Sequence, residues 1–375
     1  MIRILIGGDV CPMGRIGNEF VRGNAKAIFG DLTGDISNAD FAVVNLECPL
    51  ITKETPIAKS GPVLGASIEC VKGFAASGCK VLNLANNHIF DHGADGLRET
   101  MRSISRAGLG IVGAGENLEK AQIPYVASLQ GARIVVYAMA EHEFSIAGEK
   151  SPGVNPLDMI NFTRTIQRHK RDGIFIVLIH GGQEHYLYPS PEMVRRCRFM
   201  IDMGADAVIC CHAHCPQPWE IYSGRPIVYG LGNLVFELDE KMPESWYEGY
   251  LAALTIDNAM IHFEPIPYFQ SKELAGARKM SDGESKKFLA KMHIRCARLG
   301  EPGFINRHWA EYCGRKRNEY LAMLFAYNKI MTKMKGLLLK KLHSKEALLC
   351  ALNLVQCESH REVLEGILGE ERREG

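Results

Sequence analysis

The sequence predicts a layered α/β fold followed by an all-helical C-terminal extension. Short apolar runs alternate with helical patterns in the first part of the chain, which is typical of strands and helices stacked in layers. From Trp219 onward, short strands are joined by turn signals such as Gly230-Leu231-Gly232-Asn233, and this predicts a hairpin-rich, antiparallel end to that domain. Beyond residue 268 helix formers take over. We therefore expect two domains, residues 1–268 and a basic helical extension at residues 269–375.

The expected elements follow from apolar periodicity. The expected strands are Ile2–Ile6, Phe41–Val44, Val81–Leu84, Ile111–Val112, Ile134–Tyr137, Phe175–Ile179 and Ala207–Cys210. The expected helices between them are Ala94–Ala107, Leu157–Arg171 and Pro191–Met203. In the extension, Ser281 followed by Glu284 is typical of a helix start. Between Tyr320 and Leu342, apolar residues advance by three or four positions, which predicts one amphipathic helix.

Composition places the chain among ordinary globular proteins. Its 375 residues are 46% hydrophobic and 23% charged, which is enough to build a real core. No run of 18 or more apolar residues appears, so no transmembrane helix is expected. The start at Met1 has no long apolar region of the signal-peptide type, and we expect a cytoplasmic location. Twelve irregularly spaced cysteines predict free thiols rather than a disulfide framework.

The net charge of +1 hides an asymmetry between the two parts. Residues 271–375 hold 21 basic and 13 acidic residues, and the first 270 hold 23 and 30. An acidic first domain would repel phosphate backbones, so no nucleic-acid partner is expected. In the extension, Lys329, Lys333 and Lys340 lie opposite the apolar stripe. Three alternatives follow: a helix packed on the first domain, a surface for anionic lipid or an acidic partner, or a helical dimer contact.

Polar side chains of metal-ligand types follow five of the expected strands. They are Asp9, Asn45 with Glu47, Asn87 with His88, His180, and His212 with His214. Ligand sites of open α/β sheets lie in the crevice at the strand C-termini, so we expect these side chains to cluster. Oxygen and imidazole donors without an obligatory thiolate favour Mn, Fe or Zn over Mg or Ca. Six donors suit two ions that share a carboxylate, an arrangement that can activate a hydroxide for displacement at phosphorus.

Taken singly, each of these residues has a plainer interpretation. Asp9 would be a turn or helix cap, Asn86-Asn87 a turn with left-handed asparagines, and His88 a buried structural residue. His212 and His214 on an extended segment would place both rings on one side. Unrelated turns at five consecutive strand ends would be an improbable coincidence. The occurrence of ligand-type residues at all five therefore favours a metal site.

In order and spacing, these motifs resemble the CapA family of capsule or poly-γ-glutamate synthesis proteins, within the calcineurin-like metallophosphatase superfamily. The matching motifs are Gly8-Asp9 with Arg15, Asn45-Leu46-Glu47, Asn86-Asn87-His88 with Asp91, His180-Gly181-Gly182, His212-x-His214 and Tyr229-Gly230-Leu231-Gly232-Asn233. The resemblance covers roughly the first 265 residues. It implies a four-layer αββα metallophosphatase-like sandwich with a dinuclear metal site at the strand ends.

The resemblance also implies roles for individual residues. It assigns the metal ligands as follows: Asp9 and His214 to one ion, Asn87, His180 and His212 to the other, and Glu47 to both. It implies that His88 lies over the leaving-group oxygen as general acid or charge stabiliser and that Arg15 grips a substrate phosphate, with Asp91 of the His88 motif counted beside them as catalytic. Cys11 stands where the superfamily usually has a histidine, and Cys211 where the family usually has a glycine. Few ligands are assigned to the first metal ion, so a site that holds a single ion remains an alternative.

The implied function is hydrolysis by a metal-dependent phosphoesterase with a metal-activated hydroxide as nucleophile. The expected substrate is a small or carbohydrate-linked phosphate in capsule, surface-polysaccharide or poly-γ-glutamate metabolism. Two alternatives stay open: a non-hydrolytic accessory protein of polymer biosynthesis, and a metal-dependent γ-glutamyl amide hydrolase.

Overall fold

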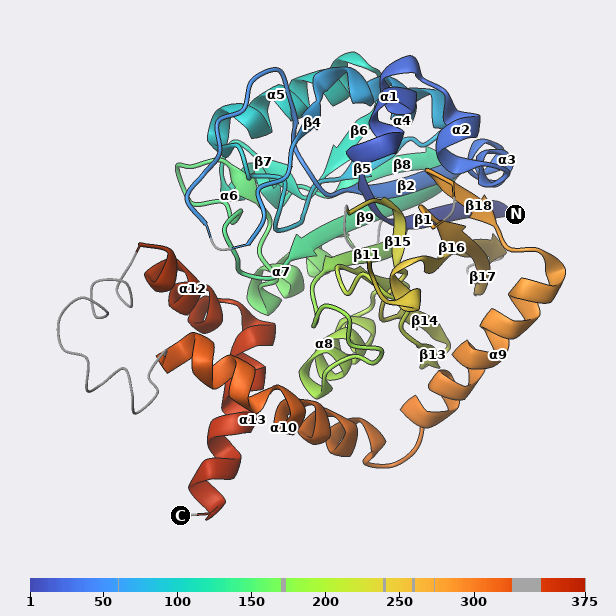
Figure 1. The fold of residues 1–375 in the computed structure, drawn as a ribbon. Helices are drawn as coiled ribbons and strands as arrows, with labels where there is room; N and C mark the ends of the chain where they lie inside the picture. Colours follow the sequence, from blue (N-terminus) through green and yellow to red (C-terminus); the bar gives the residue numbers. More distant parts are fainter. Residues whose placement is uncertain are drawn as a thin grey trace.

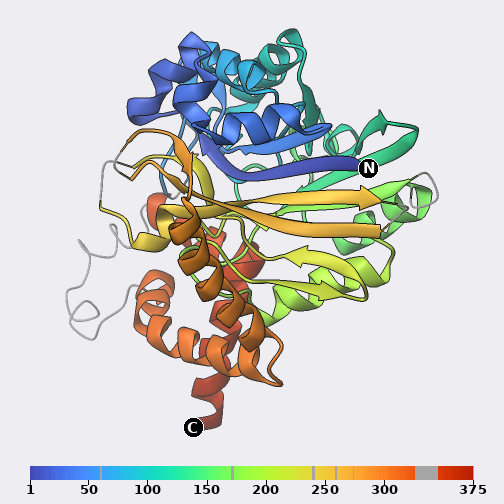
Figure 2. The same cartoon turned by 90° about the vertical axis from the view of Figure 1, so that its right-hand side faces the viewer.

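Two β-sheets lie face to face, with helices on both outer faces (Figures 1 and 2). The computed structural model describes residues 1–59, 61–169, 173–238, 241–257, 260–272, 274–325 and 345–374. The four layers and the helical C-terminal region confirm the predicted fold class.

The first sheet runs in the order β18-β17-β16-β1-β2-β5-β6, and β15 also pairs with β1. Its strands are β1 Ile2–Cys11, β2 Phe41–Leu46, β5 Val81–Asn83, β6 Gly110–Val112, β15 Asn233–Phe236, β16 Glu248–Asp257, β17 Met260–Gln270 and β18 Ala277–Lys279. Strands β1, β2, β5 and β6 are parallel, whereas β16, β17 and β18 form the predicted antiparallel end. The carboxyl ends of the parallel strands therefore meet at one edge.

The second sheet runs in the order β13-β14-β12-β11-β9-β8. Its strands are β8 Tyr125–Leu129, β9 Ala132–Ala140, β11 Ile174–His180, β12 Ala207–Cys211, β13 Trp219–Tyr222 and β14 Arg225–Val228. Small ribbons pair β3 Leu50–Ile51 with β4 Ala66–Ser67, and β7 Ala114–Gly115 with β10 Gly153–Val154. The central strands β9, β11 and β12 are parallel, so they too end at a common edge.

Helices cover both outer faces. The helices beside the first sheet are α1 Gly17–Arg22, α2 Ala25–Phe29, α3 Leu32–Asn38, α4 Val71–Ser77 and α5 Gly93–Arg106. The short α6 Leu118–Ala121 follows β7, and α7 Met159–His169 and α8 Pro191–Asp202 pack on the second sheet. Three 3₁₀ turns complete this part: Gly14–Ile16, Ile68–Cys70 and Glu244–Trp246. The three helices expected from the sequence correspond to α5, α7 and α8.

Strand β11 contributes side chains to two hydrophobic cores, one on each face of the second sheet. Ile176 and Leu178 belong to the core between the two sheets, whereas Phe175, Val177 and Ile179 pack with the helices outside. Successive side chains point to opposite faces of a strand, so a continuous apolar run fills both layers. The strand is buried on both faces, which explains why its sequence shows no polar alternation.

The extension consists of α9 Asp282–Leu299, α10 Phe304–Phe325, α12 Lys345–Gln356 and α13 Glu358–Glu374. The helix start at Ser281 is a capping box with Glu284, as predicted. The boundary expected after residue 268 lies within β17, and the first sheet continues to Lys279, so the division into two domains stays a prediction. Most of the expected stripe from Tyr320 to Leu342, including its three lysines, lies outside the described residues. Within the described ranges, no helix has the length and apolarity needed to cross a membrane.

Aromatic packing attaches α10 to the loop that follows β11. Tyr186 of that loop lies 4.5 Å from Tyr312 and 5.4 Å from Trp309, measured between ring centroids. These side chains form a buried cluster with residues of α12 and α13. Polar contacts add to it, because Glu362 accepts hydrogen bonds from the Ser190 hydroxyl at 2.7 Å and from the Glu192 N–H at 3.0 Å.

This packing predicts that the extension stabilises the first domain. Trp309 is only 6% exposed, and its replacement by alanine should cost about 3–5 kcal/mol because it leaves a cavity. Thermal unfolding of Trp309→Ala measures the loss. The matched control is Ile294→Ala on α9, where the side chain is 59% exposed and little change is expected. A Trp309→Ala melting temperature equal to that of the control would contradict the prediction.

Candidate metal centre

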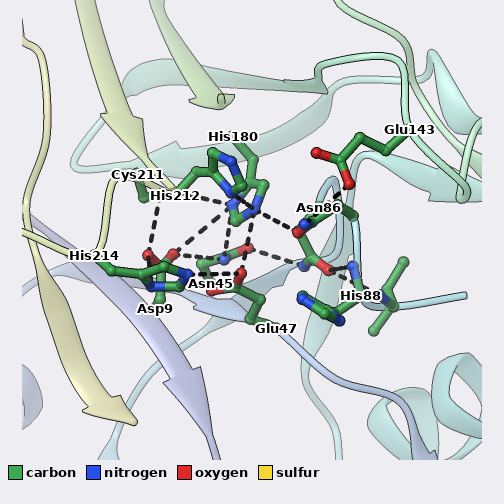
Figure 3. Close-up of polar contacts among 12 residues, drawn as sticks. Asp9, Asn45, Glu47, Asn86, His88, Glu143, His180, Cys211, His212 and His214 are labelled. Carbon is green, nitrogen blue, oxygen red and sulfur yellow. Dashed lines mark hydrogen bonds and ion pairs between the residues drawn. The ribbon is translucent and has the colours of Figure 1, made fainter. Parts of the chain in front are cut away.

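Side chains from five strand ends converge between the two sheets (Figure 3). The six predicted ligands, here called the central cluster, are Asp9 of β1, Glu47 after β2, Asn87 after β5, His180 at the end of β11, and His212 and His214 after β12. Each is at most 6% exposed. The cluster is thus buried at the shared edge of two sheets whose strands are far apart in sequence.

The backbone of β1 is shaped to present Asp9. A Cβ atom on Gly8 would lie 2.0 Å from the carbonyl oxygen of Gly232, so only glycine fits there. The pairing register of β1 shifts beside Asp9 on both neighbouring strands, and such irregularities redirect side chains. The Asp9 carboxylate accepts hydrogen bonds from Asn45 Nδ2 at 2.8 Å and from the backbone N–H of His212 at 3.0 Å.

A chain of amide side chains fixes the turn after β5. Asn45 Oδ1 accepts hydrogen bonds from Nδ2 of Asn83 at 3.0 Å and of Asn86 at 3.2 Å. Asn86 Oδ1 in turn accepts the backbone N–H groups of His88 at 3.2 Å and Ile89 at 2.8 Å. The turn is therefore held by side chains rather than by regular structure, and its asparagines are not left-handed, because neither Asn86 nor Asn87 has a positive φ angle.

His180 lies at the middle of the central cluster. Its Nε2 is 2.9 Å from Asn87 Oδ1, 3.0 Å from His212 Nδ1 and 3.3 Å from Glu47 Oε1. Burial lowers the pKa of His180 well below its ordinary value and that of His212 to about 3. Both rings are therefore neutral at physiological pH, which is the form of histidine that binds a metal ion.

His214 is oriented by a residue outside the predicted set. Its Nδ1 lies 2.8 Å from Asn233 Oδ1, while its Nε2 lies 3.8 Å from Glu47 Oε1. An amide oxygen only accepts hydrogen bonds, so Nδ1 carries the proton and Nε2 keeps its lone pair toward the cluster. Metal-bound histidines are commonly fixed by such a bond through the other ring nitrogen.

Glu47 is the residue that most plainly lacks a partner. It is fully buried, and neither carboxylate oxygen has a hydrogen-bond partner within the described ranges. Burial and the neighbouring Asp9 carboxylate raise the pKa of Glu47 well above its ordinary value. Leaving a carboxylate uncompensated inside a protein costs several kcal/mol, on the order of a buried ion without its partner. The residues present therefore fit a cation at Glu47.

The donor atoms fall into two groups, each with its ligand atoms within 4.8 Å of one another. Asp9 groups with His180 and Cys211, and Glu47 groups with His212 and His214. Two groups are compatible with two ions, but the pairing differs from the one implied by the resemblance, which places Asp9 with His214. Cys211 was not among the predicted ligands, and its thiol lies 3.5 Å from His180 Nδ1.

The backbone of the His212-x-His214 segment corrects one expectation. The segment is not extended: β12 ends at Cys211, and His212 and His214 have positive φ angles of 95° and 53°. Such conformations are costly for residues other than glycine and are concentrated at functional sites. The two rings still lie close together, with centroids 5.9 Å apart, because the turn and not strand alternation brings them there.

His88 and Asp91 form a hydrogen-bonded pair at the edge of the cluster. His88 Nδ1 lies 2.7 Å from Asp91 Oδ2, and Lys59 Nζ donates to Asp91 Oδ1 at 2.6 Å. The side chains of Lys59 and Asp91 are 2% and 0% exposed. Burial lowers the pKa of His88, and its hydrogen bond to Asp91 partly offsets this effect. Lys59 lies in a segment without periodicity or a recognisable motif, so the sequence carried no signal for it.

Arg15 lies in the 3₁₀ turn after β1. Among the described residues, its hydrogen bonds and its ion pair are made with residues outside the central cluster. Its guanidinium pairs with Glu237 and donates to the carbonyl oxygen of Ser271 at 3.4 Å, and its side chain is 53% exposed. The guanidinium is thus held beside the first sheet, with half of its surface in solvent. A phosphate-gripping role for Arg15 stays a prediction.

Comparison with known proteins shows which family this chain is similar to. The family model described as "Bacterial capsule synthesis protein PGA_cap" matches residues 3–238. A capsule biosynthesis protein CapA of Bacillus anthracis is 32% identical over 61% of this chain and 58% of its own length. A PGA biosynthesis protein CapA of Bacillus subtilis (strain 168) is 32% identical over 57% of each chain.

A solved structure of a hypothetical protein from Thermus thermophilus gives a TM-score of 0.46 at 12% identity, over 72% of this chain and 99% of that one. A similarity of this extent supports no conclusion about function. The curated relatives are matched over just under three fifths of their length.

Fold and site together define a layered α/β protein with a buried cluster of metal-ligand side chains at the strand ends. Since the family model matches more than half of the chain, the chain belongs to the bacterial capsule synthesis family PGA_cap. The predicted relationship to CapA proteins is thereby confirmed.

The buried Lys59–Asp91 ion pair predicts that removing the charge of Lys59 strongly lowers the free energy of unfolding. Lys59→Met leaves Asp91 buried without its cation and should cost about 3–5 kcal/mol in the free energy of unfolding. Lys72→Met is the matched control, because Lys72 pairs with Glu69 on the surface and is 56% exposed. The free energy of unfolding lost in Lys72→Met should stay within about 0.5 kcal/mol. Chemical denaturation measures both, and equal losses would show that the buried pair contributes no more than a surface pair.

The unpartnered carboxylate predicts how metal content responds to substitution. Protein purified without chelator should hold about one to two transition-metal ions per chain, as a shared-carboxylate site does. Glu47→Gln keeps the shape but removes the charge, so it should lower metal content more than Asn87→Ala or His214→Ala. Inductively coupled plasma mass spectrometry measures the content. Glu237→Gln, which removes a carboxylate outside the cluster, serves as the control, and a loss there as large as that in Glu47→Gln would refute the assignment.

Proposed function

We propose that this chain is a metal-dependent phosphoesterase-type hydrolase that acts on a small or carbohydrate-linked phosphate in capsule or poly-γ-glutamate metabolism. The observation that carries the proposal is the fully buried Glu47 carboxylate without a hydrogen-bond partner in the described part of the chain, beside the imidazoles of His180 and His214. When bound, metal ions would supply an acidified water molecule and charge stabilisation at the phosphate oxygens. The ions would be held by the central cluster, with Cys211 as a further candidate.

His88 is proposed as the general acid. Its Nδ1 donates to Asp91, so a ring that acts as the acid must be the imidazolium, protonated on both nitrogens, and Nε2 would give its proton to the leaving oxygen. Asp91 holds the ring in that orientation, and its second oxygen is engaged by Lys59. Besides burial, a charge on His88 lowers the pKa values of His180 and His212, so the acid would stand close to residues that would hold the ions.

The names of the relatives favour a second candidate. The matched proteins are described by capsule and PGA biosynthesis, which suits an accessory protein of polymer synthesis without turnover of its own. Hydrolysis of a γ-glutamyl amide is the remaining alternative for the same site. The membrane or acidic partner of the basic extension is likewise a proposal, because the stripe that suggests it lies outside the described residues.

The substrate class is tested by parallel assays of the metal-loaded protein. Activity on p-nitrophenyl phosphate and not on γ-glutamyl p-nitroanilide would support the phosphoesterase proposal. The reverse result would replace it by amide hydrolysis. Activity on neither substrate, with metal bound, would favour the accessory role.

The role of His88 predicts a dependence on the leaving group. His88→Gln should lower kcat on phenyl phosphate by roughly a hundredfold or more, because a poor leaving group needs a proton. The loss on p-nitrophenyl phosphate should be much smaller, since that group departs without one. Metal content and melting temperature are measured beside the rates. Equal losses on both substrates, accompanied by a lower melting temperature, would instead mark His88 as a structural residue.

A further inference from the structure

A second group of ligand-type side chains lies where the helical extension meets the first domain. The loop after β9 contacts the first turn of α13: Glu358 pairs with the His142 imidazole and accepts the His142 backbone N–H at 3.0 Å. The His142–Glu358 contact brings Glu143 close to Cys357 and His360.

Three of these residues carry donors of different kinds. The ligand atoms of Glu143, Cys357 and His360 all lie within 4.8 Å of one another. Cys357 immediately precedes α13, and His360 lies in the first turn of that helix. Cys357 Sγ is 3.9 Å from Glu143 Oε1.

An unsatisfied atom gives an independent sign of a ligand. His360 Nδ1 is buried and has no hydrogen-bond partner within the described part of the chain. A buried polar atom without a partner costs desolvation free energy that a bound ion or donor would recover. We propose that Glu143, Cys357 and His360 form a further metal site, for a zinc-like divalent ion, that joins the helical extension to the first domain.

Donor chemistry and spacing both suit this class of ion. A thiolate, an imidazole and a carboxylate are the ligands of zinc sites, and three protein ligands leave the fourth tetrahedral position to water. Zn–S and Zn–O bonds of about 2.3 and 2.0 Å place the two ligand atoms about 3.5 Å apart across a tetrahedral angle. The separation of 3.9 Å between Cys357 and Glu143 needs to close by only a few tenths of an ångström.

The site would also act on the central cluster through one side chain. Asn87 Nδ2 donates to Glu143 Oε2 at 3.3 Å, while Asn87 Oδ1 faces His180 Nε2 at 2.9 Å (Figure 3). An ion that holds Glu143 would therefore fix the orientation of the Asn87 amide, with its oxygen toward the cluster. By this route the extension becomes a positioning element for the centre, whatever reaction the centre performs.

Cobalt titration of the full chain, after chelator removes resident metal, tests the proposal. Cys357→Ser should bind one ion fewer than the wild type and should lose a thiolate-to-cobalt charge-transfer band. Cys350→Ser is the matched control, since this half-buried cysteine of α12 lies outside the group, and it should bind as the wild type does. Cys211→Ser separates any band that arises from the central cluster. Unchanged stoichiometry and spectrum in Cys357→Ser would overturn the proposal.

Two further variants keep the result decisive. If Cys357→Ser does not fold, His360→Gln and Glu143→Gln take its place, and both should lose the same single ion. Glu47→Gln should lose ions of the central cluster while keeping the band that depends on Cys357. The further site and the proposed phosphoesterase can therefore fail separately: one is measured by this band, the other by turnover.

Discussion

The burial of two carboxylates between two sheets is the constraint on which the rest of this site depends. Asp9 is satisfied by an amide and a backbone N–H, whereas Glu47 has neither and lies beside the His180 and His214 imidazoles. Such a pocket gathers carboxylate oxygens and imidazole nitrogens without a lysine or arginine side chain that contacts Glu47 within the described residues. A divalent cation bound there would compensate the Glu47 carboxylate.

Rigidity around the cluster comes from amide side chains. Asn45 links Asp9 to the turn after β5, and Asn86 shapes that turn through two backbone N–H groups. Because these bonds are buried, each is costly to break. Asn233 does the same for His214 from the other side. The side chains of the central cluster are thus oriented in advance, which would lower the entropy lost if an ion binds.

The last strands of the first sheet and the whole helical extension lie beyond the part of the chain that the family model matches. The family model ends at residue 238, yet residues of α10 and α13 contact the loops after β9 and β11. Those loops follow strands that end at the central cluster, so their conformation bears on the centre. Glu143 lies on one of them and contacts Asn87, which gives the extension a short route to the ligands.

The sequence by itself determined the layered fold and the six side chains of the central cluster. Apolar runs of strand length, each followed by a ligand-type residue, are local signals, and parallel strands bring such ends to one edge. The helix start at Ser281 was equally local, because a capping box needs only four residues.

Tertiary structure alone decided which partners complete the site. Lys59, Asn233 and Cys211 act through contacts with other segments of the chain. Asn233 and Cys211 lie in motifs that the sequence showed but without a predicted role, and the neighbours of Lys59 along the chain give no sign of its role. The turn at His212 and His214 was missed for the same reason. Its positive φ angles are imposed by the bonds that Asp9 and Asn233 make with it, not by local preference. Burial, pairing and unsatisfied charge are properties of the packed chain, so only packing can reveal them.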